Sequence, residues 1–254
     1  MPVLNEKAFL LGSSGATGKA VLGLLLKHRV FKEIVLIGRR KSFENDFGDP
    51  HDFETIVTEV VVDFDKISEY NSAFAGCKYG FCCLGTRISW SMALEALTPS
   101  YFKRNVPITE TNFKVDHDYV INSALMAKES GCKSFSVISS QMASKDSWVF
   151  CSKVKGLVEA ELSQMSFDEL KLYRPAMILA GRENMHWVEW LFLTFSSPMF
   201  YLWPKHTCIP FEHIAKAMIW NACFNEEQTD EVEGIDNARI YDMATAFDND
   251  VGKH

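Results

Sequence analysis

Three evenly spaced glycines lie near the start of the chain, in the segment Gly12-Ser-Ser-Gly-Ala-Thr-Gly18. The apolar run Ala8–Leu11 precedes them, and Thr17–Val30 follows with helical apolar spacing. Glycines at such a turn let a phosphate approach the backbone N–H groups at the positive end of a helix dipole. The spacing predicts a binding site for the pyrophosphate of a dinucleotide, with an ordinary strand–helix turn as the alternative. The expected contacts are Gly12, Ser13, Ser14, Gly15, Ala16, Thr17 and Gly18.

A basic run follows the next predicted strand, Glu33–Ile37. An acidic residue at this place would bind the ribose 2′-hydroxyl of NAD, whereas the planar fork of arginine suits a 2′-phosphate. Arg39 lies about twenty residues beyond Gly18, close to the distance expected for this role. We therefore predict NADP(H), held by Arg39 and Arg40, with a solvated basic turn as the alternative.

Two further loops are expected at the carboxyl ends of strands, where open parallel sheets bind their ligands. Asp63 ends the predicted strand Thr58–Val62, and we expect it to lie beside the adenine. Gly85 and Thr86 follow the predicted strand Tyr79–Leu84, and we expect them under the ribose. Loops without a ligand role are the alternative for both.

Strands and helices alternate as far as residue 181, which predicts an α/β fold with a doubly wound parallel sheet. This is a Rossmann fold with a small C-terminal extension. We place the NAD(P)-binding domain at residues 1–224, including an aromatic-rich part from about residue 182, and a polar tail at 225–254. The other expected elements are a loop at Ser42–Phe53, helices at Ile67–Phe74, Thr111–Ser130, Val149–Met165 and near Phe211–Phe224, and strands at Ser134–Ile138 and Leu170–Tyr173.

Composition excludes several classes of protein. The chain has 254 residues, of which 47% are hydrophobic and 23% charged, enough to bury a full core. Its net charge of -7, without a basic stripe, argues against nucleic-acid binding. Seven cysteines without a C-x-x-C pair favour a reducing compartment and predict no metal site. We expect no signal peptide and no transmembrane segment, because no run of about eighteen apolar residues occurs.

Several short strings occur together: LLGSSGATG, IVLIGRR, VVDFD, GFCCLGT, VDHDYV, SVISS, KVKGLVEAEL and YRPA. Through this combination, which spans about residues 6–220, the chain resembles the HIV-1 Tat-interactive protein 2 family of atypical short-chain dehydrogenase/reductases, which bind NADP(H). The resemblance implies a monomer or weak dimer in the cytoplasm, with the nucleus as a second location. It also implies nuclear-import receptors as partners, and roles in apoptosis and growth control.

The same resemblance implies a catalytic centre. Short-chain dehydrogenases place a tyrosine four residues before a lysine on one helix face, and the cation helps the phenol to exchange a proton with a substrate carbonyl. Lys155 matches the lysine, and Ser139 or Ser140 matches a serine that polarises the same oxygen. Cys151 occupies the tyrosine position, so the usual proton donor is absent.

This replacement leaves three interpretations open. The chain has lost turnover and works as a cofactor-sensing or scaffold protein; or it is an NADP-dependent oxidoreductase with weakened catalysis on a carbonyl; or it uses another proton donor, such as water or the Cys151 thiol. The alternative for Cys151 is a small apolar helix residue. Lys155 is expected to bind the nicotinamide ribose in each case, with a surface lysine as its alternative.

The resemblance also implies that residues after the sixth strand line the nicotinamide side. Pro175 is therefore expected near the cofactor, where it removes a backbone donor and fixes the loop. A purely structural end to the strand is the alternative.

Two segments lie outside this scheme. Residues 87–111 form an insertion of about twenty residues relative to the family pattern, long for a connection in a compact domain. A lid over the cleft, a flexible surface excursion and retained non-coding sequence are the alternatives. The aromatic segment Trp187–Trp203 fits an apolar substrate wall or a membrane-interface contact, with core packing as the alternative.

Overall fold

A parallel β-sheet organises the computed structural model, which describes residues 1–86, 110–179, 208–224 and 231–251. The predicted insertion and aromatic segment therefore lie almost wholly outside the described residues. The strands of this sheet are β1 (Leu4–Leu11), β2 (Phe31–Gly38), β3 (Ile56–Val61), β4 (Cys77–Cys82), β5 (Ser134–Ile138), β6 (Glu169–Arg174) and β9 (Val232–Asp236). They pair in the order β3-β2-β1-β4-β5-β6-β9, all in parallel. The predicted doubly wound Rossmann fold is confirmed.

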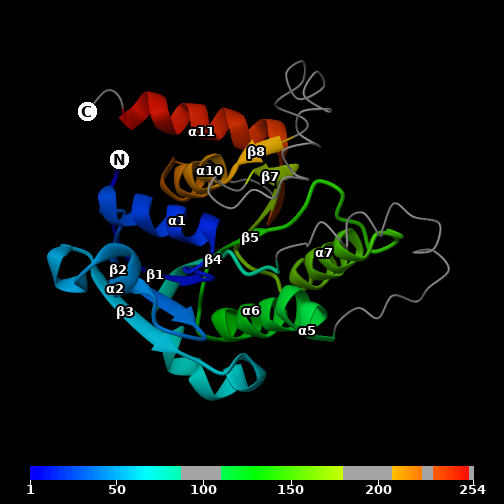
Figure 1. Cartoon of the computed structure of the whole chain (residues 1–254), viewed down its shortest axis with the longest axis horizontal. Helices are drawn as coiled ribbons and strands as arrows, with labels where there is room; N and C mark the ends of the chain where they lie inside the picture. Colours follow the sequence, from blue (N-terminus) through cyan, green and yellow to red (C-terminus); the bar gives the residue numbers. More distant parts are fainter. Residues whose placement is uncertain (87–109, 180–207, 225–230, 252–254) are drawn as a thin grey trace.

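Helices cover both faces of the sheet (Figure 1). On one face lie α1 (Ala16–Lys27), α10 (Phe211–Phe224) and α11 (Asn237–Val251). On the other lie α5 (Glu110–Phe113), the π-helical turn η3 (Lys114–Asp118), α6 (Tyr119–Glu129) and α7 (Phe150–Leu162). The remaining elements are α2 (Phe43–Phe47), the 3-10 helices η1 (Pro50–Asp52) and η2 (Phe64–Ala73), and a separate pair of short strands, β7 (Met177–Leu179) and β8 (Cys208–Pro210).

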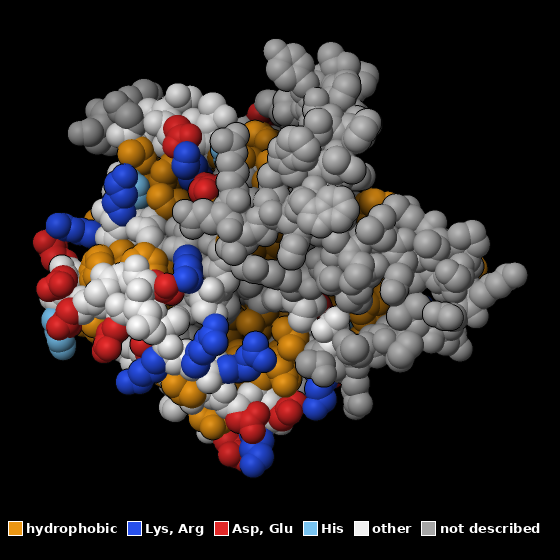
Figure 2. Space-filling view, viewed as in Figure 1, with side chains coloured by type: hydrophobic (Ala, Val, Ile, Leu, Met, Phe, Trp, Pro, Cys, Tyr) orange, Lys and Arg blue, Asp and Glu red, His pale blue; other side chains and the backbone are white. Residues whose placement is uncertain are grey.

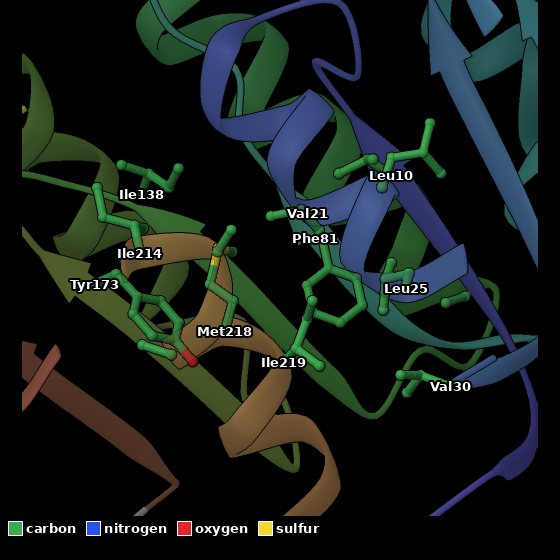
Figure 3. Packing of buried hydrophobic residues seen from close by; sticks show 14 of the residues in the cluster. Leu10, Val21, Leu25, Val30, Phe81, Ile138, Tyr173, Ile214, Met218 and Ile219 are labelled. Atoms are coloured by element: carbon green, nitrogen blue, oxygen red, sulfur yellow. The ribbon is translucent and has the colours of Figure 1, made fainter. Parts of the chain in front are cut away.

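The apolar run in β1 is buried because both faces of the sheet are covered. Successive side chains of a strand point to opposite faces. Ala8 and Leu10 accordingly join the core under α1 and α10, whereas Phe9 and Leu11 join the core under α6 and α7. Figure 3 shows the first of these cores, where Phe81 of β4 packs between α1 and α10.

The predicted polar tail is wrong for residues 232–251, which complete the domain. β9 pairs with β6, and Ile235 is fully buried. α11 packs on α10 and buries only Asn237, Ile240, Ala244 and Phe247. These four residues form a narrow buried stripe at helical spacing. Because most other residues of α11 are polar, the overall composition of the segment does not reveal the helix.

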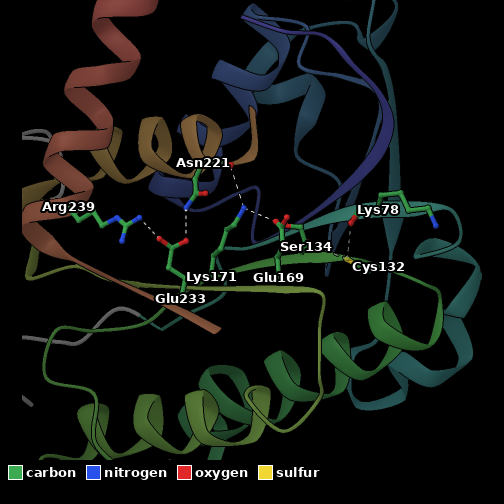
Figure 4. Close-up of polar contacts among 8 residues, drawn as sticks. All are labelled: Lys78, Cys132, Ser134, Glu169, Lys171, Asn221, Glu233 and Arg239. Atoms are coloured by element: carbon green, nitrogen blue, oxygen red, sulfur yellow. Dashed lines mark hydrogen bonds and ion pairs between the residues drawn. The ribbon is translucent and has the colours of Figure 1, made fainter. Parts of the chain in front are cut away.

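A chain of polar contacts fastens β9 and α11 to the sheet (Figure 4). The ammonium of buried Lys171 lies 2.8 Å from the Glu169 carboxylate and donates to the Asn221 carbonyl of α10. The Asn221 amide donates to Glu233 of β9, whose carboxylate lies 2.6 Å from Arg239 of α11. Buried charges are stable only with partners of this kind. The contacts therefore hold β6, α10, β9 and α11 together.

Local hydrogen bonds explain other differences from the predicted elements. The predicted loop Ser42–Phe53 contains α2, at whose start the Glu59 carboxylate accepts the N–H groups of Ser42 and Phe43, and η1, which Asp49 caps by accepting the His51 N–H. The predicted helix Ile67–Phe74 is 3-10 and begins earlier, with Asp63 as its cap. The predicted helix Thr111–Ser130 is continuous in direction but contains the π-helical turn η3.

The two edge strands offer a matched test of the revised C-terminal end. Ile235→Ala in β9 is expected to cost about 3 kcal/mol of unfolding free energy, because it leaves a cavity in the core. Ile56→Ala in β3, where the side chain is 55% exposed, is expected to cost less than about 1 kcal/mol. Urea denaturation measures both. Equal, small effects would show that residues 232–251 are not part of the cooperative fold.

Candidate functional site

The candidate site lies where β1 and β4 are neighbours. These strands sit side by side in the sheet, and the chain leaves them in opposite directions, toward β2 on one side and β5 on the other. The loops that follow such a pair diverge and leave a crevice at the carboxyl ends of the strands. The predicted segments 12–18 and 85–86 are thus brought to the same edge of the sheet, where the Cys83 N–H donates to the Leu11 carbonyl at 2.9 Å.

The glycine turn is shaped by two very close backbone contacts. A Cβ atom on Gly18 would lie 2.1 Å from the Gly12 carbonyl oxygen. A Cβ on Gly12, whose φ is +79°, would lie 2.6 Å from the Cys83 carbonyl oxygen. Glycine is therefore required at both positions to pack β1 against α1 and β4. Gly15 differs, since a Cβ there would meet only the Gly12 oxygen at 3.5 Å, an ordinary contact.

The first turn of α1 lies at the carboxyl end of β1 and carries backbone N–H groups that no side chain caps. Gly15 is the N-cap residue, and no side chain caps the helix or places an acidic group in its first turn. The N–H groups of a first turn have no partner within the helix and carry the positive end of its dipole. Ser14, Gly15 and Ala16 are exposed, whereas Ser13 is buried. These residues fit an anionic group that approaches the backbone closely.

The two arginines after β2 are exposed, and neither contacts another described residue through a hydrogen bond or ion pair. Arg39 lies near Tyr119 of α6. Burial and the neighbouring Asp65 carboxylate raise the pKa of the Tyr119 phenol, and the Arg39 cation opposes that rise. Figure 2 shows charged side chains of both signs over the described part of the surface in that view. Arg39 and Arg40 thus keep their donors available to a ligand at the end of β2.

Asp63 has a structural task at the end of β3. Its carboxylate accepts the Asp65 N–H at 3.1 Å and caps η2. The next residue, Phe64, is buried and stacks on Tyr119 with ring centroids 5.0 Å apart. The contact of Asp63 with adenine stays a prediction.

An aspartate that sequence reasoning missed fixes the loop after β4. Asp116, in η3, accepts the Thr86 N–H at 2.8 Å with one carboxylate oxygen and the Thr86 hydroxyl with the other. A Cβ on Gly85 would lie 3.4 Å from the same carboxylate. π-Helical turns are rare and often mark functional sites. The only signal in the sequence was the string VDHDYV, which did not identify Asp116.

Lys155 and Cys151 project from α7 one turn apart, at the spacing that places two side chains on one helix face. The Lys155 ammonium donates to the Ile138 carbonyl at 3.2 Å, which brings the cation to the carboxyl end of β5. Cys151 is partly buried. A Cβ on Gly156 would lie 2.2 Å from the Ser144 backbone, so the loop between β5 and α7 packs tightly on the helix.

The two candidate serines differ in their surroundings. The Ser139 hydroxyl is buried and lies 2.6 Å from the Glu159 carboxylate. Ser140 is partly buried, and its hydroxyl has no hydrogen-bond partner among the described residues. Glu159 and its second partner, Arg174, were not predicted as site residues. Arg174 donates to both carboxylate oxygens, at 2.9 and 2.7 Å, and these hydrogen bonds raise the pKa of its guanidinium.

Pro175 is buried and directly follows β6. It connects this strand to the loop after β5 that carries Ser139 and Ser140, called here the serine loop. Its carbonyl accepts the Gln141 N–H at 2.9 Å, and the next N–H, of Ala176, donates to the Asn237 side chain of α11. Pro175 therefore holds the loop after β5 in place, whereas its contact with a cofactor stays a prediction.

A hollow of about 360 Å³ opens between α7, residues 143–146, β6 and β9. Its lining includes Glu159 and Arg174 but none of the predicted cofactor-binding residues. The candidate cofactor site at the carboxyl ends of β1 and β4 is therefore separate from this hollow.

Metal-binding clusters and membrane-spanning helices are absent from the residues that the structure describes. No group of three or more histidine, cysteine, aspartate or glutamate side chains there could hold a metal ion. Among the same residues, no helix is both long and apolar enough to cross a bilayer.

All seven cysteines are free, and burial raises the pKa of the Cys82 thiol, near Lys155, to about 11.

The fold and site define a Rossmann-type protein with a glycine turn at the switch point of its sheet. Comparison with known proteins narrows this class. The chain is 36% identical to protein HTATIP2 of Rattus norvegicus over 218 residues, 85% of this chain and 81% of that protein. The chain belongs to the HTATIP2, or HIV-1 Tat-interactive protein 2, family, as predicted.

More distant similarities agree with this fold. The mitochondrial protein FMP52 of Eremothecium gossypii is 27% identical over 70% of this chain and 69% of its own length. A Rossmann-fold NAD(P)-binding family protein from Shigella flexneri superposes with a TM-score of 0.54 at 14% identity, over 91% of this chain and 93% of that chain. No family model matches the chain.

Alanine substitutions at Gly18 and Gly15 distinguish the packed glycine of this turn from the exposed one. Gly18→Ala is expected to lower the unfolding free energy by about 2 kcal/mol or more, because the new methyl group collides with the Gly12 carbonyl. Gly15→Ala is expected to change it by less than about 0.5 kcal/mol, because only an ordinary contact forms. Urea denaturation reports both values. An equal loss in the two variants would contradict the described turn.

Proposed function

We propose that the chain binds NADP(H) at the turn between β1 and α1 and acts as an atypical short-chain dehydrogenase/reductase on a carbonyl substrate. The observation that carries the cofactor proposal is the uncapped first turn of α1 beside an exposed Gly15. A Cβ there would project into open space apart from the Gly12 oxygen. The pyrophosphate would take hydrogen bonds from these N–H groups and favourable energy from the helix dipole.

The preference for NADP(H) over NAD(H) rests on Arg39 and Arg40. Both are exposed at the end of β2, and neither is neutralised by a described carboxylate. A guanidinium pairs with two phosphate oxygens at once, so one such residue can distinguish a 2′-phosphate from a 2′-hydroxyl. Asp63 would lie toward the adenine, and Gly85 and Thr86 toward the ribose.

The reaction proposed for the site is reduction of a carbonyl by hydride supplied by the nicotinamide. At the carboxyl end of β5, the Lys155 ammonium would bind the nicotinamide ribose, and a serine hydroxyl would polarise the carbonyl oxygen. Pro175 would hold the adjoining loop. Cys151 stands where the family places its proton donor, so proton transfer would come from this thiol or from water, and turnover would be slow.

A second candidate function follows from the same cysteine. A chain that binds NADP(H) tightly without turnover could act as a cofactor-sensing regulatory protein, provided that the cofactor favours one conformer over another. Its partners would then be those of the family, nuclear-import receptors among them, in apoptosis or growth control. The cytoplasm and nucleus are the proposed locations; the name of the FMP52 relative adds the mitochondrion as the alternative to be distinguished by imaging.

Isothermal titration with NADPH and NADH tests the cofactor proposal. The parent chain is expected to bind NADPH at least about tenfold more tightly than NADH, a difference of about 1.4 kcal/mol. Arg39→Asp is expected to reverse this preference, because it replaces a phosphate ligand with a group that suits the 2′-hydroxyl. Arg29→Asp, the same charge change at an exposed residue paired with Glu54, is the control and should leave the preference unchanged. Equal affinities in the parent would overturn the assignment of the arginines.

Carbonyl-dependent oxidation of NADPH tests the reductase proposal. Across a panel of aldehydes and ketones, Cys151→Tyr is expected to raise turnover by about 10²-fold, because it supplies the missing general acid. Lys155→Ala is expected to abolish turnover in both backgrounds. Lys153→Ala, an exposed lysine on the same helix, is the control. Tight NADPH binding with no turnover in the parent or in Cys151→Tyr would favour the regulatory function.

A further inference from the structure

Glu159 is the point at which α7, β5 and β6 are joined. Its carboxylate lies 2.6 Å from the Ser139 hydroxyl, which follows β5, and receives two hydrogen bonds from Arg174 at the end of β6. Glu159 and Ser139 are each only 7% exposed. A buried carboxylate with three donors is held in one geometry, and each donor is fixed in return.

This arrangement decides what the Ser139 hydroxyl can do. A carboxylate paired with arginine is ionised and only accepts hydrogen bonds, so Ser139 must donate its single proton to Glu159. Only the lone pairs of Ser139 remain, and a substrate carbonyl, which is itself an acceptor, gains nothing from them. The Ser140 hydroxyl has no partner among the described residues and can donate.

The turn that carries Ser140 is held by hydrogen bonds at the residue before it and at the residue after it. On one side the Ser139 N–H donates to the Tyr173 carbonyl at 2.7 Å, and the Ser139 side chain is held by Glu159. On the other side the Gln141 N–H donates to the Pro175 carbonyl at 2.9 Å. The position of the Ser140 hydroxyl therefore depends on the attachment of Ser139.

The contacts of Glu159 extend through Arg174 to the edge strand β9. The Arg174 guanidinium lies across Gly234, where a Cβ would come within 3.1 Å of Nη1. Gly234 therefore leaves room for Arg174 to reach Glu159. The C-terminal strand thus supports the serine loop, although it is distant from that loop in sequence.

We propose that Glu159 is a positioning residue, which holds Ser139 as a donor and so leaves Ser140 as the hydroxyl that polarises the substrate carbonyl. The positioning part stands on the described contacts alone. The assignment of Ser140 rests on the proposed reductase function.

Hydrogen exchange and turnover, measured on the full chain, test the two parts separately. Glu159→Gln is expected to speed exchange of the Gln141 and Ala143 amides by at least about tenfold, because the turn loses its attachment. Glu161→Gln, the same change on the same helix at a half-buried residue whose carboxylate contacts His117 instead of the serines, is the control and should not speed this exchange. Ser139→Ala keeps the ion pair with Arg174 and should also speed exchange, which preserves the test if Glu159→Gln does not fold.

Turnover is expected to depend more on Ser140 than on Ser139, the reverse of amide exchange. Ser140→Ala is expected to leave exchange unchanged but to lower kcat by at least about tenfold, whereas Ser139→Ala lowers kcat only about threefold, with NADPH affinity kept in both. Unchanged exchange in Glu159→Gln and Ser139→Ala, or faster exchange spread along α7 and β6, would overturn the positioning role. A larger kcat loss in Ser139→Ala than in Ser140→Ala would overturn the assignment of Ser140. If no variant turns over a carbonyl, the reductase function fails, and the exchange results still decide the role of Glu159.

Discussion

The contact between the Gly12 carbonyl and the Cα of Gly18 is the constraint on which the site depends. It brings the end of β1 against the first turn of α1, and Gly12 also lies against the backbone of Cys83, just after β4. Three elements can meet this closely only where side chains are absent. The result is a helix whose first turn lies at the switch point of the sheet, with no side-chain cap on its N–H groups. The proposed affinity for a dinucleotide follows from this backbone arrangement.

The second half of the candidate site is fixed by side chains instead. Lys155 reaches the end of β5 through the Ile138 carbonyl, and Glu159 reaches the next residue through Ser139. Both come from one face of α7, which also carries Cys151. A rigid frame thus surrounds the position where the family has its tyrosine. This is why Cys151 bears so directly on the choice between a slow reductase and a cofactor-sensing protein.

Much of the fold could be predicted because hydrophobic pattern alone determines it. Ser134–Ile138 and Phe211–Phe224 have the predicted bounds, since their apolar residues lie between clear turn or polar signals. The glycine turn was also predictable, because its spacing is tied to one strand–helix geometry. β9 and α11 were missed because one buried isoleucine and a narrow apolar stripe stand among polar residues. β7 and β8 were missed because strands of three residues carry no periodicity.

The missed site residues share a different cause. Asp116 and Glu159 act through partners that are 30 and 20 residues away in sequence, Thr86 and Ser139. Arg174 pairs with Glu159 only because β6 lies beside β5 and Gly234 leaves space above β9. Such pairings depend on the packed fold, and no local spacing reveals them. Local motifs could therefore predict the glycine turn, whereas the polar contacts around the serines required the structure.

The N–H groups at the start of α1 can be observed directly by amide NMR of the isotope-labelled chain during titration with NADPH. Bound pyrophosphate is expected to shift the Ser14, Gly15 and Thr17 amide resonances more than those of any other helix start, and to protect these amides from exchange. Unchanged resonances at these three residues, with shifts elsewhere or with no shift at millimolar NADPH, would contradict a dinucleotide site at this turn.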